Sequence, residues 1–335
     1  MTGKRIAIVG AGKMTRARGR AFLDTARAQI CAIASRRLDK ARLCATELGC
    51  ETCYDDYRLL EKANPDAILV EVPHGPQDDI VKWALETGYD VLIGGSLASS
   101  VVAGEEIVGL AERRRLIVEA GYQRRYDPSW AEARRLVRED VIGAPIMAVT
   151  TALWNPEPSS WYYNQRDSGG MPLTHLSYAF MNAIRWIMGQ PRSVFAMANR
   201  KVETLPERVR EETCGVLVGF EDGSFASVTA SYAGPSRMSS PEPRIVCTRG
   251  GVQFNPEESP DVVSMTVFRD DTSEVLSFEA KPSALVRQAG RFLDSLDSRL
   301  PALNPPEDAL IDVRIAEAIS MSAREQRMVR LPVPE

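Results

Sequence analysis

The chain opens with the stretch Lys4-Arg5-Ile6-Ala7-Ile8-Val9-Gly10-Ala11-Gly12-Lys13-Met14-Thr15, and this stretch decides its fold. A short apolar run without proline breaks into two glycines one residue apart, and helical spacing follows from Arg16 to Arg27. The pattern predicts a strand, a tight turn and a helix. Backbone N–H groups and the dipole at such a helix start bind anions. We expect Gly10 to permit the turn and Gly12 to let a pyrophosphate approach the backbone.

The turn matches the fingerprint G-x-G-x-x-G except at its last position, where Thr15 stands in place of glycine. A glycine turn alone is a weak signal, because it can simply reverse the chain, so the surrounding pattern has to decide. A second strand over 30–34 and a helix over 38–48 follow, as dinucleotide-binding folds require. We therefore assign the turn, including Lys13 and Met14, to cofactor binding.

The residues after the second strand bear on which dinucleotide binds. They are Ser35, Arg36 and Arg37, at the position where dinucleotide folds contact the adenosine ribose. An acidic residue there would hold the two ribose hydroxyls of NAD(H), whereas a serine and two arginines suit a 2′-phosphate. The pattern favours NADP(H) over NAD(H). The alternative is a solvated basic turn at the head of a helix.

Composition limits the classes of protein that fit. The 335 residues are too many for one ordinary core and fit two domains. The content of 44% hydrophobic and 26% charged residues is typical of a soluble globular protein, and the net charge of -4 argues against a nucleic-acid partner. No apolar run approaches a membrane span, and the early strand leaves no room for a signal peptide, so a cytoplasmic protein is expected.

The six cysteines raise the question of a metal site, because Cys50 and Cys53 form a C-x-x-C with Cys44 nearby. A zinc ion would need a fourth ligand, and the chain has only two histidines, His74 and His175. Reduced thiols in a cytosolic fold are the simpler interpretation, and we expect no metal.

The order of predicted elements divides the chain. Strands and helices alternate over residues 1–121, which predicts an α/β domain with a Rossmann-type, doubly wound parallel sheet. Ligands in such sheets bind at the carboxyl ends of the strands, after Val9, Ala34, Val72, Ile93 and Ala120.

Residues 122–335 have a different pattern. They predict a C-terminal α+β domain with an open, mostly antiparallel sheet, because period-two segments follow one another from residue 146 to residue 278. Two helices over 284–299 and 309–326 complete the chain, and the last helix may fold back onto the first domain. A long loop rich in proline, serine and aromatic residues ends at Gly170, and such loops are often lids or subunit contacts.

With these elements in place, the sequence resembles the Gfo/Idh/MocA superfamily, the relatives of glucose-fructose oxidoreductase and inositol dehydrogenase, over essentially its whole length. The resemblance implies hydride transfer to or from sugars, cyclitols or related carbonyls and imines, and a homodimer or homotetramer joined through the open sheet. It is carried by four local matches: Ile6-Ala-Ile-Val-Gly-Ala-Gly-Lys-Met; the strand ending Val72-Pro73; Gly121-Tyr-Gln-Arg-Arg-Tyr-Asp-Pro128; and Ser168-Gly-Gly-Met-Pro with Asn182-Ala-Ile-Arg-Trp-Ile-Met-Gly189.

The chain departs from the family at the catalytic lysine. Similar proteins carry a Glu-Lys-Pro triplet whose lysine hydrogen-bonds the reacting oxygen, whereas this chain has Gly94-Gly95-Ser96 and no lysine between Lys82 and Lys201. Glycine has no side chain to move a proton, and such help is worth about 10²- to 10⁴-fold in rate. We assign Gly94 and Gly95 to the cofactor site and expect an atypical mechanism.

A second family signature is also altered. The resemblance places His175 where similar enzymes have an aspartate, and Tyr178 lies one residue before the position of their histidine or tyrosine. Residues 175 and 178 are neighbours on one helix face, so the tyrosine could give a proton that the histidine holds or replenishes. The alternative is a half-buried histidine beside a packing tyrosine.

Other predicted site residues fall around these. Glu71 ends an apolar strand, so its carboxylate should face the cofactor cleft, pair with a base, or be protonated. The remaining cofactor-site predictions are Val72, Pro73, His74 and Gln123, and the remaining substrate-site predictions are Tyr122, Arg124, Trp161, Tyr163 and Asn182.

Two functions remain open. The first is an NADP(H)-dependent oxidoreductase that acts on a carbonyl or imine of a small polar metabolite without the usual lysine. The second is a protein that keeps the nucleotide fold without net redox chemistry, such as a ligand-binding regulator or a redox-neutral lyase, hydrolase or epimerase with tightly bound cofactor. Thr15 counts mildly for the second.

Overall fold

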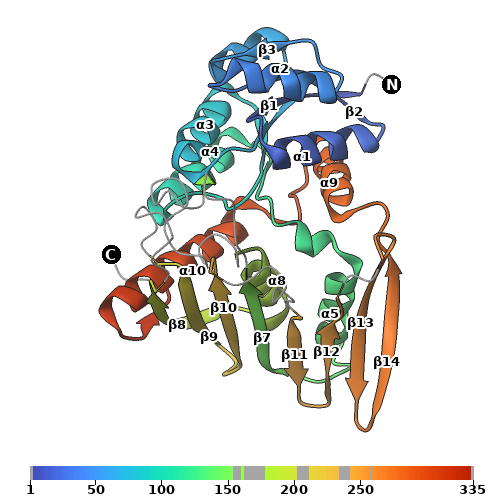
Figure 1. The fold of residues 1–335 in the computed structure, drawn as a ribbon, viewed down its shortest axis with the longest axis vertical. Helices are drawn as coiled ribbons and strands as arrows, with labels where there is room; N and C mark the ends of the chain where they lie inside the picture. Colours follow the sequence, from blue (N-terminus) through green and yellow to red (C-terminus); the bar gives the residue numbers. More distant parts are fainter. Residues whose placement is uncertain are drawn as a thin grey trace. The chain divides into compact units, whose positions relative to one another are not determined.

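The computed structural model describes residues 3–153, 160–161, 178–201, 211–233, 242–256 and 259–332. They form two compact units, of which the first comprises Met1–Gln123 with Ser283–Val313, and the second comprises Arg124–Pro282 with Arg314–Glu335. Figure 1 shows a sheet with flanking helices in each unit.

The first unit is built on a six-stranded parallel sheet of order β3-β2-β1-β4-β5-β6. Its central strands are apolar and buried on both faces, as expected when helices cover both sides of a parallel sheet. The predicted Rossmann-type sheet is confirmed. The strands are β1 (Lys4–Val9), β2 (Ala28–Ala34), β3 (Cys53–Tyr54), β4 (Ala67–Val70), β5 (Asp90–Ile93) and β6 (Val118–Glu119).

Helices connect these strands, and several begin where a polar side chain caps the first turn. Ser100 accepts a hydrogen bond from the N–H of Ala103, and Ser283 does the same for Val286. Two helices begin earlier than the sequence pattern predicted, α1 at Lys13 instead of Arg16 and α3 at His74. The helices are α1 (Lys13–Asp24), α2 (Leu38–Glu47), α3 (His74–Thr87), α4 (Val101–Arg114), α9 (Ala284–Ser298) and the 3-10 helix η1 (Tyr57–Ala63).

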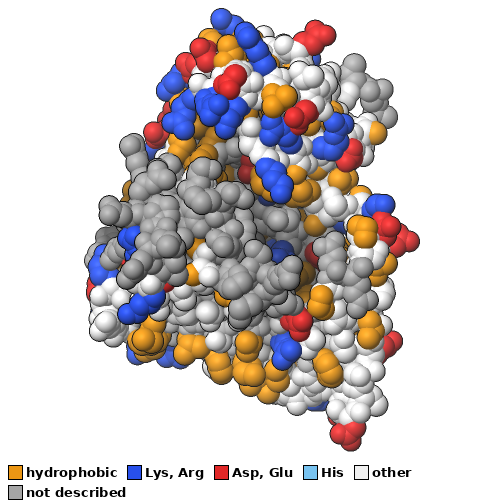
Figure 2. Space-filling model, viewed as in Figure 1, with side chains coloured by type: hydrophobic (Ala, Val, Ile, Leu, Met, Phe, Trp, Pro, Cys, Tyr) orange, Lys and Arg blue, Asp and Glu red, His pale blue; other side chains and the backbone are white. Residues whose placement is uncertain are grey.

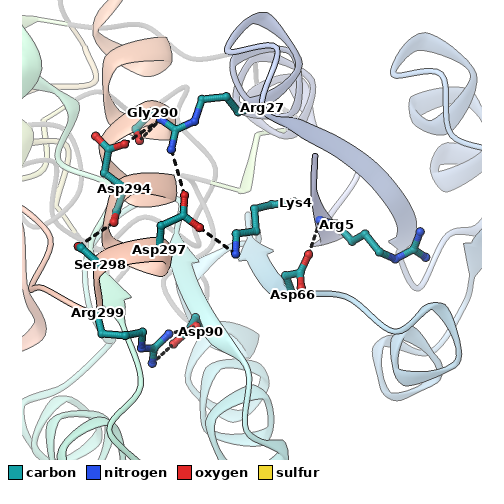
Figure 3. Close-up of polar contacts among 10 residues, drawn as sticks. All are labelled: Lys4, Arg5, Arg27, Asp66, Asp90, Gly290, Asp294, Asp297, Ser298 and Arg299. Carbon is teal, nitrogen blue, oxygen red and sulfur yellow. Dashed lines mark hydrogen bonds and ion pairs between the residues drawn. The ribbon is translucent and has the colours of Figure 1, made fainter. Parts of the chain in front are cut away.

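The C-terminal part of the chain returns to this unit through α9. Phe292 of α9 packs edge-on against Phe22 of α1, with ring centroids 6.2 Å apart. Figure 3 shows the polar contacts around it: Arg27 pairs with Asp294 and Asp297 of α9, and Lys4 also pairs with Asp297. The sequence-based division assigned all of 122–335 to one domain. The compact units differ from it, because α9 buries its apolar face on α1.

The second unit contains a nine-stranded sheet of order β14-β13-β12-β11-β7-β10-β9-β8-β15. Only β7 and β10 pair in parallel, so the expected open, mostly antiparallel sheet is confirmed. The sequence analysis missed β12 because its two glycines interrupt the alternation. The strands are β7 (Pro145–Leu153), β8 (Pro191–Asn199), β9 (Thr213–Phe220), β10 (Phe225–Ser231), β11 (Arg244–Cys247), β12 (Gly250–Phe254), β13 (Val262–Arg269), β14 (Thr272–Glu279) and β15 (Val329–Arg330).

Helices α5 (Pro128–Arg138) and α8 (Tyr178–Met188) belong to the second unit, and α10 (Pro306–Glu325) begins in the first and ends in the second. One sheet face carries exposed apolar side chains, including Phe195, which lies opposite Leu217 on the neighbouring strand, and Phe225. Figure 2 shows hydrophobic side chains along the part of this unit that β8 to β11 form. No helix in the described part of the chain is long and apolar enough to cross a membrane.

Candidate functional site

The first candidate region is the edge of the parallel sheet where the strand order reverses. From β1 the chain moves outward to β2 and β3, then returns to β4 on the other side of β1. Backbone hydrogen bonds align the residues that follow these strands: the N–H of Gly10 donates to Ala34 O, that of Glu71 to Val9 O, and that of Gly94 to Val70 O, each at 2.8 Å. Ligands of open α/β sheets bind at such a reversal.

The glycine turn has the form that an anion site requires. Gly10 has a φ of +126°, and a Cβ atom there would overlap the carbonyl oxygen of Glu71, so only glycine fits. Gly12, Lys13 and Met14 are exposed at the start of α1. The first N–H groups of a helix have no carbonyl partner within it, so those of Lys13 and Met14 are suited to bind phosphate oxygens.

Thr15 replaces the third glycine of the fingerprint without disturbing the turn. Its side chain is fully buried, and its Oγ1 accepts a hydrogen bond of 3.0 Å from the N–H of Gly12. The same hydroxyl donates over 3.5 Å to the carbonyl oxygen of Glu71. Thr15 therefore caps the helix and ties the turn to β4, and the departure from the fingerprint is structurally accommodated.

The end of β2 carries the residues predicted to select the cofactor. The Ser35 N–H donates to Tyr54 O, and the Ser35 hydroxyl oxygen accepts a hydrogen bond from the N–H of Arg37. The Arg37 guanidinium pairs with Asp39 at 3.1 Å and lowers the pKa of that carboxyl. Arg36 is exposed and makes no ion pair or hydrogen bond with any side chain in the described ranges. These contacts leave Arg36 as the cation available to a ligand.

A buried arginine that the sequence analysis did not select joins the strand ends. Arg18 of α1 is 3% exposed, and its Nε lies 2.8 Å from a carboxylate oxygen of Glu71. Its Nη2 donates to the carbonyl oxygens of Gly94 and Gly121, and its Nη1 donates to Gln288 of α9 at 2.7 Å. Arg18 therefore holds together the residues that follow three strands.

Glu71 is thus paired with a base, one of the three possibilities that its buried position allowed. Burial raises the pKa of its carboxyl, and the Arg18 guanidinium opposes that rise. The carboxylate also lies over Gly94, because a Cβ atom at residue 94 would overlap all three of its atoms. Where relatives place the glutamate of their triplet, this chain has a bare backbone covered by a carboxylate from the neighbouring strand. Glycine at 94 follows from that arrangement.

His74, at the start of α3, is almost fully buried. Burial lowers its pKa to about 4, and a hydrogen bond with Gln77 opposes this effect. Gln77 in turn donates to the carbonyl oxygens of Ser96 and Leu97, at 2.8 and 3.2 Å. His74 is therefore neutral at physiological pH and belongs to the packing that supports the segment after β5.

A second candidate region lies in the second unit, around the predicted residue Arg124. Its guanidinium carbon lies 3.6 Å from the centre of the Phe180 ring of α8 and 5.8 Å from that of Trp130 of α5. Burial lowers the pKa of Arg124 to about 10, an effect that Asp127 opposes. The next residue, Arg125, is 3% exposed and donates to Asn182 Oδ1 at 2.8 Å.

The other predicted site residues vary in what the structure says of them. Tyr122 is fully buried and its hydroxyl donates to Ser96 Oγ, Gln123 accepts from Arg18 over 3.4 Å, and Asn182 is fully buried. Val72, Pro73 and Trp161 are half-buried, and Gly95 is buried and accepts from the N–H of Gly121. His175 and Tyr163 lie outside the described residues, and of Tyr178 only the backbone, at the start of α8, is described.

The cysteines carry no disulfide and are free. Burial raises the pKa of Cys31 to about 11, and it also raises that of Cys50 and Cys53. Thiolates bind metals and thiols do so poorly, so burial works against a metal here. Across the described ranges, no group of three or more His, Cys, Asp or Glu residues could hold a metal ion.

Sequence comparisons place this geometry in a known context. Residues 4–122 match a domain described as "Oxidoreductase family, NAD-binding Rossmann fold", and residues 130–253 match the "GFO/IDH/MocA C-terminal domain". Myo-inositol 2-dehydrogenase of Thermotoga maritima is 23% identical to this chain, over 98% of both sequences. D-xylose 1-dehydrogenase (NADP(+)) 2 of Haloferax volcanii is 24% identical over 90% of this chain and 92% of the relative.

Solved structures show the same fold. A levoglucosan dehydrogenase in complex with NADH and L-sorbose superposes with a TM-score of 0.89 at 18% identity, over 100% of each chain. The aldose-aldose oxidoreductase of Caulobacter crescentus gives 0.88 at 22% identity, over 98% of this chain and 100% of that structure. With both family domains matched in order along the sequence, this chain belongs to the Gfo/Idh/MocA family of oxidoreductases.

Proposed function

We propose that this protein is an NADP(H)-dependent oxidoreductase that transfers hydride to or from a carbonyl or imine of a small polar metabolite, a sugar, a cyclitol or a related compound. The observation that carries the cofactor choice is the exposed guanidinium of Arg36 at the end of β2, where the chain has no acidic residue to hold the ribose hydroxyls of NAD(H). A relative whose name specifies NADP(+) supports the same choice.

The nucleotide face of the first unit fits such a cofactor. Lys13 and Met14 offer exposed N–H groups for the pyrophosphate, and Arg36, with Ser35 beside it, offers charge and hydrogen bonds for a 2′-phosphate. When bound, the nicotinamide supplies or accepts the hydride. The chain's own contribution at this edge is to hold the backbone of Gly94 and Gly121 through Arg18.

The cofactor test is a fluorescence titration with NADPH and NADH. Charge-assisted hydrogen bonds contribute about 1.5–3 kcal/mol, so NADPH should bind roughly ten- to hundredfold more tightly than NADH. Arg36→Ala should remove most of that preference, Arg37→Ala should remove less because Asp39 already pairs with Arg37, and the exposed Arg113→Ala on α4 should change nothing. Equal affinity for both dinucleotides in the wild type would refute the NADP(H) proposal.

For the chemical step we propose that Tyr178 and His175 act where the family lysine is absent. Gly95 has no side chain to move a proton, and a tyrosine and a histidine spaced i, i+3 could give and replenish one. D-xylose and myo-inositol, named in the relatives, are the first substrates to assay with NADP(+). Unchanged turnover in both His175→Ala and Tyr178→Phe would exclude this role. Retained reduced cofactor without turnover would instead favour the redox-neutral alternative.

We further propose that the protein acts in the cytoplasm as a homodimer or homotetramer joined through the open sheet. The exposed apolar residues Phe195, Leu217 and Phe225 on that sheet support self-association, because soluble monomers rarely leave such a surface uncovered. Sedimentation velocity of the purified protein measures its oligomeric state, and a monomer at micromolar concentration would refute this part of the proposal.

A further inference from the structure

Three arginines in the second unit stack on aromatic rings, and their hydrogen bonds differ. Arg125 and Arg134 lie over Trp186, with guanidinium carbons 5.5 and 4.3 Å from its ring centre. Each also has an oxygen acceptor, since Arg125 donates to Asn182 and Arg134 to the carbonyl oxygen of Trp186. Arg124 stacks most closely, on Phe180, yet no residue in the described ranges accepts a hydrogen bond from it, and its Nε is buried.

The Arg124 side chain stays charged in this environment. Its pKa of about 10 leaves it protonated at neutral pH. The carboxylate nearest in sequence, Asp127, does not neutralise it through a direct contact, because Asp127 Oδ1 accepts hydrogen bonds from both the N–H and the hydroxyl of Ser129. A partly buried cation without an acceptor is unfavourable, so an acceptor from outside the chain would stabilise it.

The shape of the group indicates what that acceptor is. A guanidinium presents its donors in a planar fork that matches a carboxylate bidentately, and stacking on Phe180 fixes the plane of the fork before a ligand arrives. Hydroxyl groups of a neutral sugar could accept hydrogen bonds, but they would leave the charge uncompensated.

We infer that Arg124 is a binding residue for a carboxylate on the substrate, so that the preferred substrates are acidic sugars such as uronic acids instead of neutral sugars. This inference rests on the proposed function, because it names the substrate class for the same oxidoreductase.

The test compares matched pairs of probes that differ only in the carboxylate: D-glucuronate with D-glucose, and D-galacturonate with D-galactose. Calorimetric titration of the protein–NADPH complex should show that the acid of at least one pair binds roughly ten- to hundredfold more tightly than its neutral partner. Arg124→Met should abolish this preference, and Arg124→Lys, which keeps the charge but loses the fork, should retain part of it.

Arg138→Met is the matched control, because it removes the same charge from an exposed position at the end of α5. It should leave the preference unchanged, and NADPH affinity and melting temperature should agree within error for all variants. Wild-type binding of neither acid, tighter binding of the neutral sugars, or an unchanged preference in Arg124→Met would each overturn the inference. Neutral sugars turned over with NADP(+) would then still support the proposed function, whereas failure to bind NADPH would overturn both.

Discussion

Two arginines, Arg18 in the first unit and Arg124 in the second, illustrate two ways in which a protein encloses a guanidinium. Arg18 is surrounded by oxygen acceptors from Glu71, Gln288 and two backbone carbonyls. Arg124 has aromatic faces and no acceptor among the described residues. A cation whose hydrogen bonds are all made within the chain stabilises the fold, whereas one whose donors remain unused is prepared for a ligand.

The same substitution at both positions tests this contrast most strongly. Arg18→Met leaves the Glu71 carboxylate buried without its partner and two carbonyls without a donor, so the free energy of unfolding should fall by about 3–5 kcal/mol. Arg124→Met removes a charge that no protein group compensates, and it should change stability by less than about 0.5 kcal/mol. Urea denaturation of the two variants measures both effects.

Replacing both members of the buried pair provides the control. Arg18→Met combined with Glu71→Gln removes the orphaned charge, so the double variant should be more stable than Arg18→Met alone. If the two single variants, Arg18→Met and Arg124→Met, lost equal stability, the contrast between the two arginines would be wrong.

His74 sharpens the comparison, because the first unit keeps it neutral where it keeps Arg18 charged. Its folded-state pKa of about 4 lies below the ordinary value of 6.5. The contribution of neutral His74 is therefore complete above pH 6.5 and is lost as the pH falls through the window from 6.5 to about 4, since the unfolded chain takes up the proton first.

The expected size of this loss is about 3 kcal/mol, from 1.36 kcal/mol for each unit of the difference. His74→Gln should remove it, so the difference in unfolding free energy between wild type and variant should narrow as the pH drops across that window. Denaturation curves at pH 8, 6 and 4 measure this, with chemical conditions otherwise matched. A wild-type-minus-variant difference that is constant with pH would show that burial does not hold His74 neutral.

The fold was largely predictable, and the misses have local causes. The glycine turn and the alternation of apolar strands with helices predicted the parallel sheet, because each strand buried on both faces leaves a continuous apolar run. The return of α9 to the first unit was not predictable from periodicity. Helical spacing shows that Phe292 is on an apolar face, but it cannot show that Phe22 is its partner.

The candidate site was predicted only in part, for a similar reason. Glu71 attracted attention as a carboxylate ending an apolar strand, and the structure supplied its partner in Arg18. Arg18 itself stood among many charged residues in a helix with no feature to distinguish it. The useful signal was the combination of an unexplained buried acid with glycine at position 94, since a bare backbone beside a buried side chain means that the side chain fills the space.

That combination gives the smallest of the expected effects and the most specific one. Gly94→Ala places a methyl group where the Glu71 carboxylate lies, so the carboxylate must move away from Arg18, at a cost of about 1–3 kcal/mol in unfolding free energy. In a Glu71→Ala background the space is empty, and the same substitution should cost less than about 0.5 kcal/mol. Gly290→Ala is the control, because nothing lies near a Cβ atom at this position of α9, and alanine should stabilise the helix by about 0.5–1 kcal/mol. Equal costs for Gly94→Ala in both backgrounds would mean that glycine is required at 94 for some reason other than Glu71, and the pairing of these two residues would lose its explanatory value.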